Sequence, residues 1–165
     1  MSFEDAILHL KKQTEGCPLN ILVWGPSVEG AEHFEKRLKI KREISSCFFN
    51  ADVRFSEDLP AGLFSSDPSD VGTEELSHLA VSDLCIVLDT SKGAGEEIAY
   101  FARSRYAQKL LILTDEAFAA STSFPSAIRR YHNQLFYNRE QYVTCSLVEI
   151  VLNRIRVIAL DKIIR

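Results

Sequence analysis

An unbroken apolar run, Leu84–Leu88, constrains the fold of this chain more than any other stretch. It has the length of a β-strand, and it contains two β-branched residues, Ile86 and Val87. A strand without polar alternation is buried on both faces, which is typical of a parallel sheet covered by helices on both sides. A polar turn with glycines follows over Asp89–Gly95, and from Glu96 onward the spacing predicts an amphipathic helix.

The rest of the chain alternates strand-like and helix-like segments in the same way. A chain of 165 residues suits one domain with a sizeable core, and its composition, 46% hydrophobic and 25% charged, is ordinary for a globular protein. We therefore predict one α/β domain over residues 1–165, with a mainly parallel sheet of about five strands and helices on both faces, in three layers. The other predicted strands are Asn20–Trp24, Ala51–Phe55, Lys109–Leu113 and Gln134–Tyr137, and the other predicted helices are Ser2–Gln13, Ala31–Ser45, Thr73–Val81 and a long closing helix from residue 140 or 141 to Ile164.

The net charge and the cysteine spacing limit the classes of partner that we expect for this chain. The net charge of −4 gives no field that favours nucleic acid. The four cysteines have no C-x-x-C spacing, so we expect reduced thiols and neither a disulfide framework nor a zinc site. We also expect no other metal and no cofactor. No apolar run approaches the ~20 residues that span a bilayer, and the start of the chain is acidic rather than basic as in a signal peptide. We expect a cytoplasmic protein with no membrane partner.

Two adjacent glutamates, Glu96 and Glu97, follow the strand and turn at the centre of the chain. In open α/β sheets ligands bind at the carboxyl ends of the strands, where these acids are expected. At about 100° per residue, Glu97 falls at the edge of an apolar stripe centred near Ile98, whereas Glu96 faces water. Glu97 is therefore the candidate catalytic residue. The alternative is structural, since acids in the first turn of a helix offset its dipole.

The spacing Gly93-x-x-x-Glu97-Ile98-Ala99-Tyr100 resembles the nucleophile segment of the nucleoside 2-deoxyribosyltransferases. The segment Ile21–Pro26, an apolar strand that ends in Gly-Pro, is similar to the opening strand of that family. TIR domains share the general layout. The resemblance covers roughly residues 20–114 and implies a flavodoxin-like fold. It also implies that Glu97 attacks the anomeric carbon of a nucleoside, a nucleotide or the nicotinamide riboside of NAD.

Two positions depart from the deoxyribosyltransferase pattern. Leu22 stands where that family usually has an aromatic residue, and Ser91 stands where it has an acid. The departures bear on the substrate more than on the bond that is cleaved.

The residues around these motifs supply candidate substrate contacts. The glycines of the loop after the first strand let the backbone approach a ligand, and a serine there donates a hydrogen bond or caps the next helix. The single tryptophan either stacks on a base or, more commonly, belongs to the core. Two polar residues of the central turn could hold sugar hydroxyls. The candidate substrate-binding residues are Trp24, Gly25, Pro26, Ser27, Asp89, Ser91 and Gly93.

The sequence leaves several questions open. A leaving base needs a proton, for which Asp58, Asp115 and solvent are candidates, and either water or a second base could accept the sugar. A non-catalytic nucleotide-sensing module or a protein-interaction module of the same fold is the alternative function. The closing helix is apolar around much of its circumference, which predicts a homo-oligomer through it.

For two of the predicted helices, the sequence favours one role of the helix surface. The Ser2–Gln13 helix either covers the sheet, the favoured interpretation, or contacts a partner. The basic cluster on the next helix is expected to be a solvated face. Its members are Lys36, Arg37, Lys39, Lys41 and Arg42.

Overall fold

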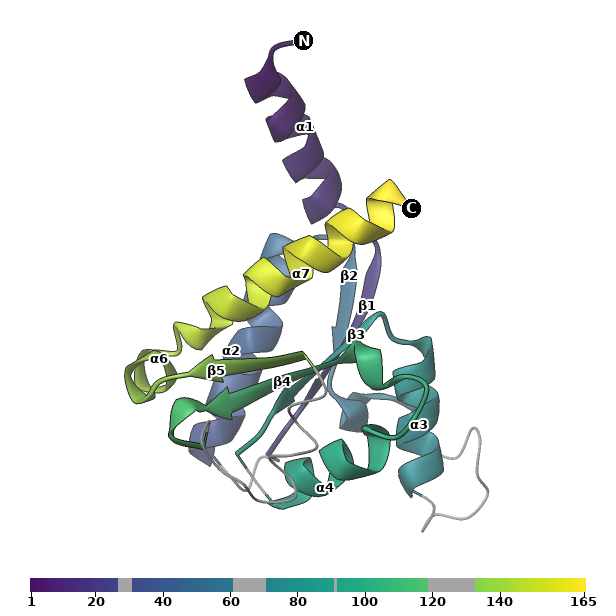
Figure 1. Cartoon of the computed structure of the whole chain (residues 1–165), viewed down its shortest axis with the longest axis vertical. Helices are drawn as coiled ribbons and strands as arrows, with labels where there is room; N and C mark the ends of the chain where they lie inside the picture. The colour runs from purple at the N-terminus through teal and green to yellow at the C-terminus, as the bar shows by residue number, and fades with distance from the viewer. Residues whose placement is uncertain (27–30, 61–70, 91, 119–132) are drawn as a thin grey trace.

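The computed structural model describes residues 1–26, 31–60, 71–90, 92–118 and 133–165 (Figure 1). The side chains at positions 31, 71, 92–94, 96–97, 118 and 133 lie outside the description as well.

A five-stranded sheet forms the middle layer, and all of its strand pairs are parallel. The strand order is β2-β1-β3-β4-β5, which is the flavodoxin-like order. Every residue of β3 is buried, as its unbroken apolar run predicts. The strands are β1 (Leu19–Trp24), β2 (Ala51–Arg54), β3 (Leu84–Leu88), β4 (Leu110–Asp115) and β5 (Asn133–Tyr137).

Helices cover both faces of this sheet, so the predicted three-layer α/β fold is confirmed. One face packs against α2 and α7, in a core that includes Ile40, Ile44 and Val151. The other face packs against α3 and α4, in a core that includes Leu79 and Ile98. The helices are α1 (Phe3–Glu15), α2 (Ala31–Cys47), α3 (Val71–Val81), α4 (Lys92–Phe101), α6 (Arg139–Thr144) and α7 (Leu147–Ile164).

Helix α1 does not cover the sheet, so the favoured interpretation of this helix is wrong. Thr14 is its one buried residue, and the structure describes the whole helix. Apart from its carboxyl end, α1 extends away from the rest of the molecule (Figure 1). Phe3, Ile7 and Leu8 are 78%, 52% and 57% exposed. The apolar stripe of α1 therefore finds no place in either core.

The predicted closing helix is two helices, α6 and α7. They are separated at Cys145, whose backbone adopts a left-handed conformation with φ of 59°. Left-handed residues commonly end helices, but the residue is usually Gly or Asn. A cysteine gives no such signal, and the apolar periodicity continues across the break, so the sequence alone predicts one helix.

Candidate functional site

The loops after β1 and β3 diverge at the carboxyl edge of the sheet. These two strands are neighbours in the centre of the sheet, with Trp24 paired to Val87. From β1 the chain goes to β2 on one side, and from β3 it goes to β4 on the other. This reversal is the topological switch point, where α/β proteins open a crevice for ligands. The predicted residues Gly25, Pro26 and Asp89 follow these two strands directly.

Gly25, at the start of the loop after β1, lies close against the end of β3. Its φ is 154°, and a Cβ atom added there would lie 3.2 Å from Leu88 Cβ and 3.5 Å from Leu88 O. L-residues rarely adopt this conformation, and the neighbouring backbone leaves little room for a side chain. The glycine therefore fixes the course of the loop at the switch point.

We expect Gly25→Ala to lower the free energy of unfolding by about 1–3 kcal/mol, because alanine is strained at this φ. Urea denaturation followed by circular dichroism measures the change. Gly16→Ala is the matched control, because Gly16 has a φ of −92°. Its added Cβ would lie 2.9 Å from the exposed ring of Phe49, which can move, and 3.3 Å from Lys12 O. Equal stability losses in the two variants would contradict the role assigned to Gly25.

Arg37 ties the loop after β1 to the loop after β2. The residue is 1% exposed, and its Nε donates to Val23 O at 2.9 Å. Its two terminal nitrogens each donate to a carboxylate oxygen of Glu57 at 2.6 Å, and Nη1 also donates to Pro26 O at 3.4 Å. The guanidinium carbon lies 4.2 Å from the centre of the Phe55 ring. The solvated-face interpretation of the basic cluster is therefore wrong for this residue.

A polar chain lies at the carboxyl ends of β3 and β4, on the sheet face that packs against α3 and α4. Thr114 Oγ1 donates to Asp89 Oδ2 at 3.4 Å, and Gln134 Nε2 donates to Thr114 Oγ1 at 3.0 Å. Strand alternation puts Asp89 and Thr114 on the same face as the buried Val87 and Ile112. The structure thus brings the predicted Asp89 together with two residues that the sequence analysis missed. Thr114 could have been found from the sequence, because it is a polar residue directly after the apolar part of a strand, where site residues are expected.

The helix that carries Glu97 begins earlier than predicted. Helix α4 starts at Lys92, so Gly93 lies inside its first turn rather than in the preceding loop, and the first turn contains no acid. Glu97 is the sixth residue of α4, beyond the turn where the helix dipole acts strongly. The first-turn explanation for this acid is therefore wrong.

Several predicted residues fall outside what the structure describes. Ser27 and Ser91 are among them, and so are the side chains of Glu96 and Glu97. For Glu97 the structure gives the helix and its position along it.

Trp24 is a core residue that holds α4 on the sheet. Its side chain is 1% exposed, and its ring centre lies 5.1 Å from that of Phe101, the last residue of α4. Ile98 of the same helix is 2% exposed in the same core. Trp24 therefore has the commoner of its two interpretations, and stacking on a base would require its ring to leave the core.

The two acids considered as proton donors are held by other groups. The Lys41 ammonium, 2.7 Å from Asp58 Oδ2, lowers the pKa of this carboxyl below its usual range. Asp115 Oδ1 accepts a hydrogen bond from the backbone N–H of Ala117 at 2.9 Å. Asp58 is ionised near neutral pH and is a poor acid there.

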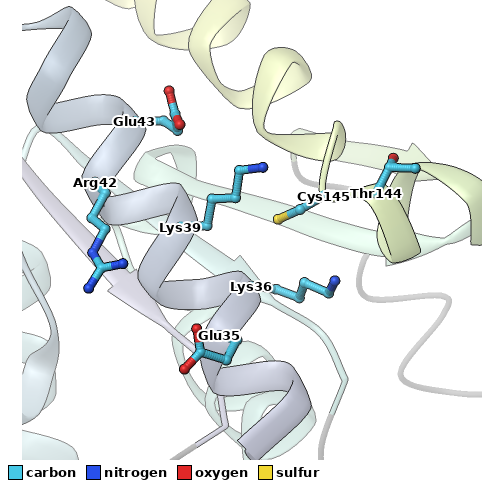
Figure 2. A pocket seen from close by; sticks show the side chains of 7 residues that line it. All are labelled: Glu35, Lys36, Lys39, Arg42, Glu43, Thr144 and Cys145. Carbon is cyan, nitrogen blue, oxygen red and sulfur yellow. The ribbon is translucent and has the colours of Figure 1, made fainter.

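A separate groove lies between α2 and the turn that joins α6 to α7 (Figure 2). Its volume is about 440 Å³, and Cys145 points from the turn toward α2 (Figure 2). Burial raises the pKa of the Cys145 thiol, so the sulfur is protonated near neutral pH and is a weak nucleophile. This groove belongs to the face opposite α4 and is not part of the predicted site. It is lined by Glu35, Lys36, Lys39, Arg42, Glu43, Thr144 and Cys145.

Within the described residues, no group of three or more His, Cys, Asp or Glu side chains is arranged to hold a metal ion. None of the helices in the described part of the chain has the length and apolar character needed to cross a membrane.

Comparison with known proteins supports the fold. A crystal structure of a conserved protein from Enterococcus faecalis V583 is similar to this chain, with a TM-score of 0.55 and 12% sequence identity. The similarity covers 83% of this chain and 99% of that one. At this identity the likeness shows the fold alone. No family model and no curated protein matches the chain.

Proposed function

We propose that this protein cleaves or transfers the N-glycosidic bond of a nucleoside, a nucleotide or NAD, with Glu97 as the nucleophile. The observation that carries the proposal is the position of α4. This helix follows β3 at the switch point of the sheet, next to the Gly25–Pro26 loop. Both segments that resemble the deoxyribosyltransferases therefore adjoin the carboxyl edge of the sheet at its switch point, although they are about 70 residues apart in the sequence.

The polar chain at the same edge suits a sugar. Asp89 is half-buried and accepts a hydrogen bond from Thr114, so its carboxylate is held at the carboxyl edge of the sheet while part of the residue stays accessible. A carboxylate and a hydroxyl side by side can accept and donate hydrogen bonds to the hydroxyls of a ribose or deoxyribose. In this proposal Asp89 binds and orients the sugar, and it takes no part in bond cleavage.

The proposed reaction requires one ionised carboxylate at the anomeric carbon of the sugar. Cleavage of an N-glycosidic bond passes through a cationic, oxocarbenium-like sugar, which a carboxylate stabilises or bonds covalently. The carbon–nitrogen bond breaks and its electron pair leaves with the base. A purine or pyrimidine takes a proton from solvent as it leaves, whereas the cationic nicotinamide of NAD leaves as a neutral base and needs none. Water then accepts the sugar in a hydrolase, and a second base accepts it in a transferase.

The test is release of free base by the wild-type protein. The substrates are a panel of ribonucleosides, 2′-deoxynucleosides, nucleotides and NAD, each incubated with and without a second free base and analysed by chromatography. We expect base release from at least one class, and a new nucleoside when the acceptor is present if the protein is a transferase. Calorimetric binding of one of these compounds with no base release from any of them would overturn the enzyme proposal and favour a nucleotide-sensing module.

A further inference from the structure

Helix α1 is a preformed helix whose apolar stripe has no partner among the residues that the structure describes. A capping box joins Ser2 and Asp5 at its amino end, with both hydrogen bonds at 3.1 Å. Phe3, Ile7 and Leu10 lie on one side of the helix at the spacing i, i+4, i+7, and they are 78%, 52% and 39% exposed. Isolated helices of about 13 residues are marginal in water. The stability of α1 therefore calls for a surface that covers this stripe.

A second exposed apolar surface lies on α7, which contacts α1. Val157 and Ile164 are 53% and 76% exposed, and Leu160 between them is half-buried. At about 100° per residue, these three residues are centred opposite the buried face of α7. Lys162 fixes this end of α7 beside the base of α1, since its Nζ donates to Pro18 O at 2.9 Å. The three α7 residues are called the α7 patch below.

We propose that α1 is the dimerisation arm of this protein and that it pairs in antiparallel orientation with α1 of a second copy. The charge order of the helix carries the choice of partner. Glu4 and Asp5 occupy its first turn, whereas Lys11 and Lys12 lie near its end. Two antiparallel copies place acids opposite bases at both ends, and parallel copies would place like charges together.

The flanks of the stripe fit the same arrangement. Glu4 and Lys11 are seven residues apart, so they lie on the same flank of the helix. A two-fold axis perpendicular to the two helices brings this flank against the same flank of the other copy. Glu4 of each copy then faces Lys11 of the other. Lys11 already lies 3.6 Å from Glu15 in an exposed pair and remains accessible.

The size of the surface also favours the antiparallel pair. Helix α1 is about 20 Å long, and two such helices alone bury less than the ~800 Å² per partner of a typical specific interface. In the antiparallel arrangement the tip of each arm reaches the base of the other, next to the α7 patch. This extends the contact from α1 onto the α7 patch. A lipid surface fits less well, because the polar side of α1 carries acids as well as lysines.

Sedimentation velocity of the full chain at about 1–100 µM tests the proposal. We expect a dimer for the wild type, and for Ile7→Asp a dissociation constant raised at least about 100-fold, because each dimer loses the residue twice. The control is Val81→Asp, which adds the same charge at a 68% exposed apolar position on α3. It should remain a dimer. A monomeric wild type across this range, or an Ile7→Asp variant as dimeric as the control, would overturn the proposal.

Charge reversal tests the orientation. Glu4→Lys and Lys11→Glu alone should each weaken the dimer about tenfold, and the double variant should restore it, because the opposed pairs are re-formed with exchanged signs. In a parallel dimer the double variant would show no such recovery, and this result would overturn the antiparallel arrangement. Far-UV circular dichroism verifies that each variant retains its helices.

Discussion

Replacing Glu97 by glutamine should slow base release at least about 1000-fold, with little change in the stability of the protein. Glutamine keeps the shape of the side chain, but its amide is neutral and a very weak nucleophile. It can neither bond to the anomeric carbon nor stabilise the cationic sugar by charge. A loss of 1000-fold in kcat corresponds to about 4 kcal/mol of transition-state stabilisation. Single-turnover assays on the best substrate of the panel measure it.

Glu96→Gln is the matched control for this variant. It removes the same charge from the adjacent position of α4, about 100° further round the helix. We expect it to retain kcat within about threefold, because the helical spacing predicts that Glu96 faces water, and a solvated charge contributes little to the reaction. If Glu96→Gln lost the activity and Glu97→Gln kept it, the assignment of the nucleophile would be wrong. Equal and mild losses in both variants would point to general electrostatics instead of a nucleophile.

The strands of this protein could be predicted because their signal is local. The buried run Leu84–Leu88 has no polar residue, and the structure gives the same bounds for β3. The β1 segment was also predicted to within one residue, since it begins at Leu19 and ends at Trp24. A parallel strand buried on both faces requires an apolar run, so the sequence carries this information directly.

Signals that depend on tertiary context were the ones that failed. Glycines at positions 93 and 95 indicate a turn by their propensity, yet α4 includes both because packing of Ile98 and Phe101 on the sheet stabilises the helix. The stripe of α1 was expected to cover the sheet. However, α2 and α7 already cover one face of the sheet, and α3 and α4 cover the other. Periodicity shows that a surface needs covering, and it does not show which surface covers it.

Some residues of the candidate site could also be predicted from local patterns, and others depend on tertiary contacts. Asp89 and the Gly25–Pro26 loop follow apolar strands, so their place at the carboxyl edge could be predicted from the strands alone. Thr114 and Gln134 join Asp89 through contacts between strands that are distant in sequence. Trp24 had two interpretations until its contact with Phe101 was known. No local pattern distinguishes a tryptophan in a core from one that faces a ligand.

For Arg37, the charge of the residue and its position on the helix led to different predictions. It was grouped with the lysines of α2 by charge, but its spacing from Ile40 and Ile44 follows the buried stripe of that helix. An arginine on such a stripe is buried only when its donors are bonded, and here they bond to Val23 and Glu57.

We expect Arg37→Met to lower the free energy of unfolding by about 2–3 kcal/mol. Methionine fills a similar volume but leaves Val23 O and Pro26 O without their donor, and unbonded buried acceptors are costly. Removing one partner of a fully buried ion pair usually costs more stability than this. The loss is smaller here because the Glu57 side chain is 49% exposed and regains contact with water. Arg42→Met, at an exposed position on the same helix, should change stability by less than about 0.5 kcal/mol.

The pH dependence of stability separates the lost ion pair from a general packing defect. Burial acts to raise the pKa of Glu57, but its hydrogen bonds with Arg37 and the guanidinium charge outweigh burial, so the pKa is lower than its ordinary value. A carboxyl whose pKa is lowered in the folded state stabilises it above the unfolded pKa, about 4.3 for glutamate, and this contribution is lost as pH falls through the folded value. The stability difference between wild type and Arg37→Met should therefore shrink as pH falls below about 4.3. Urea denaturation at a series of pH values measures this convergence, and a difference that stays constant with pH would mean that packing alone accounts for the effect of Arg37.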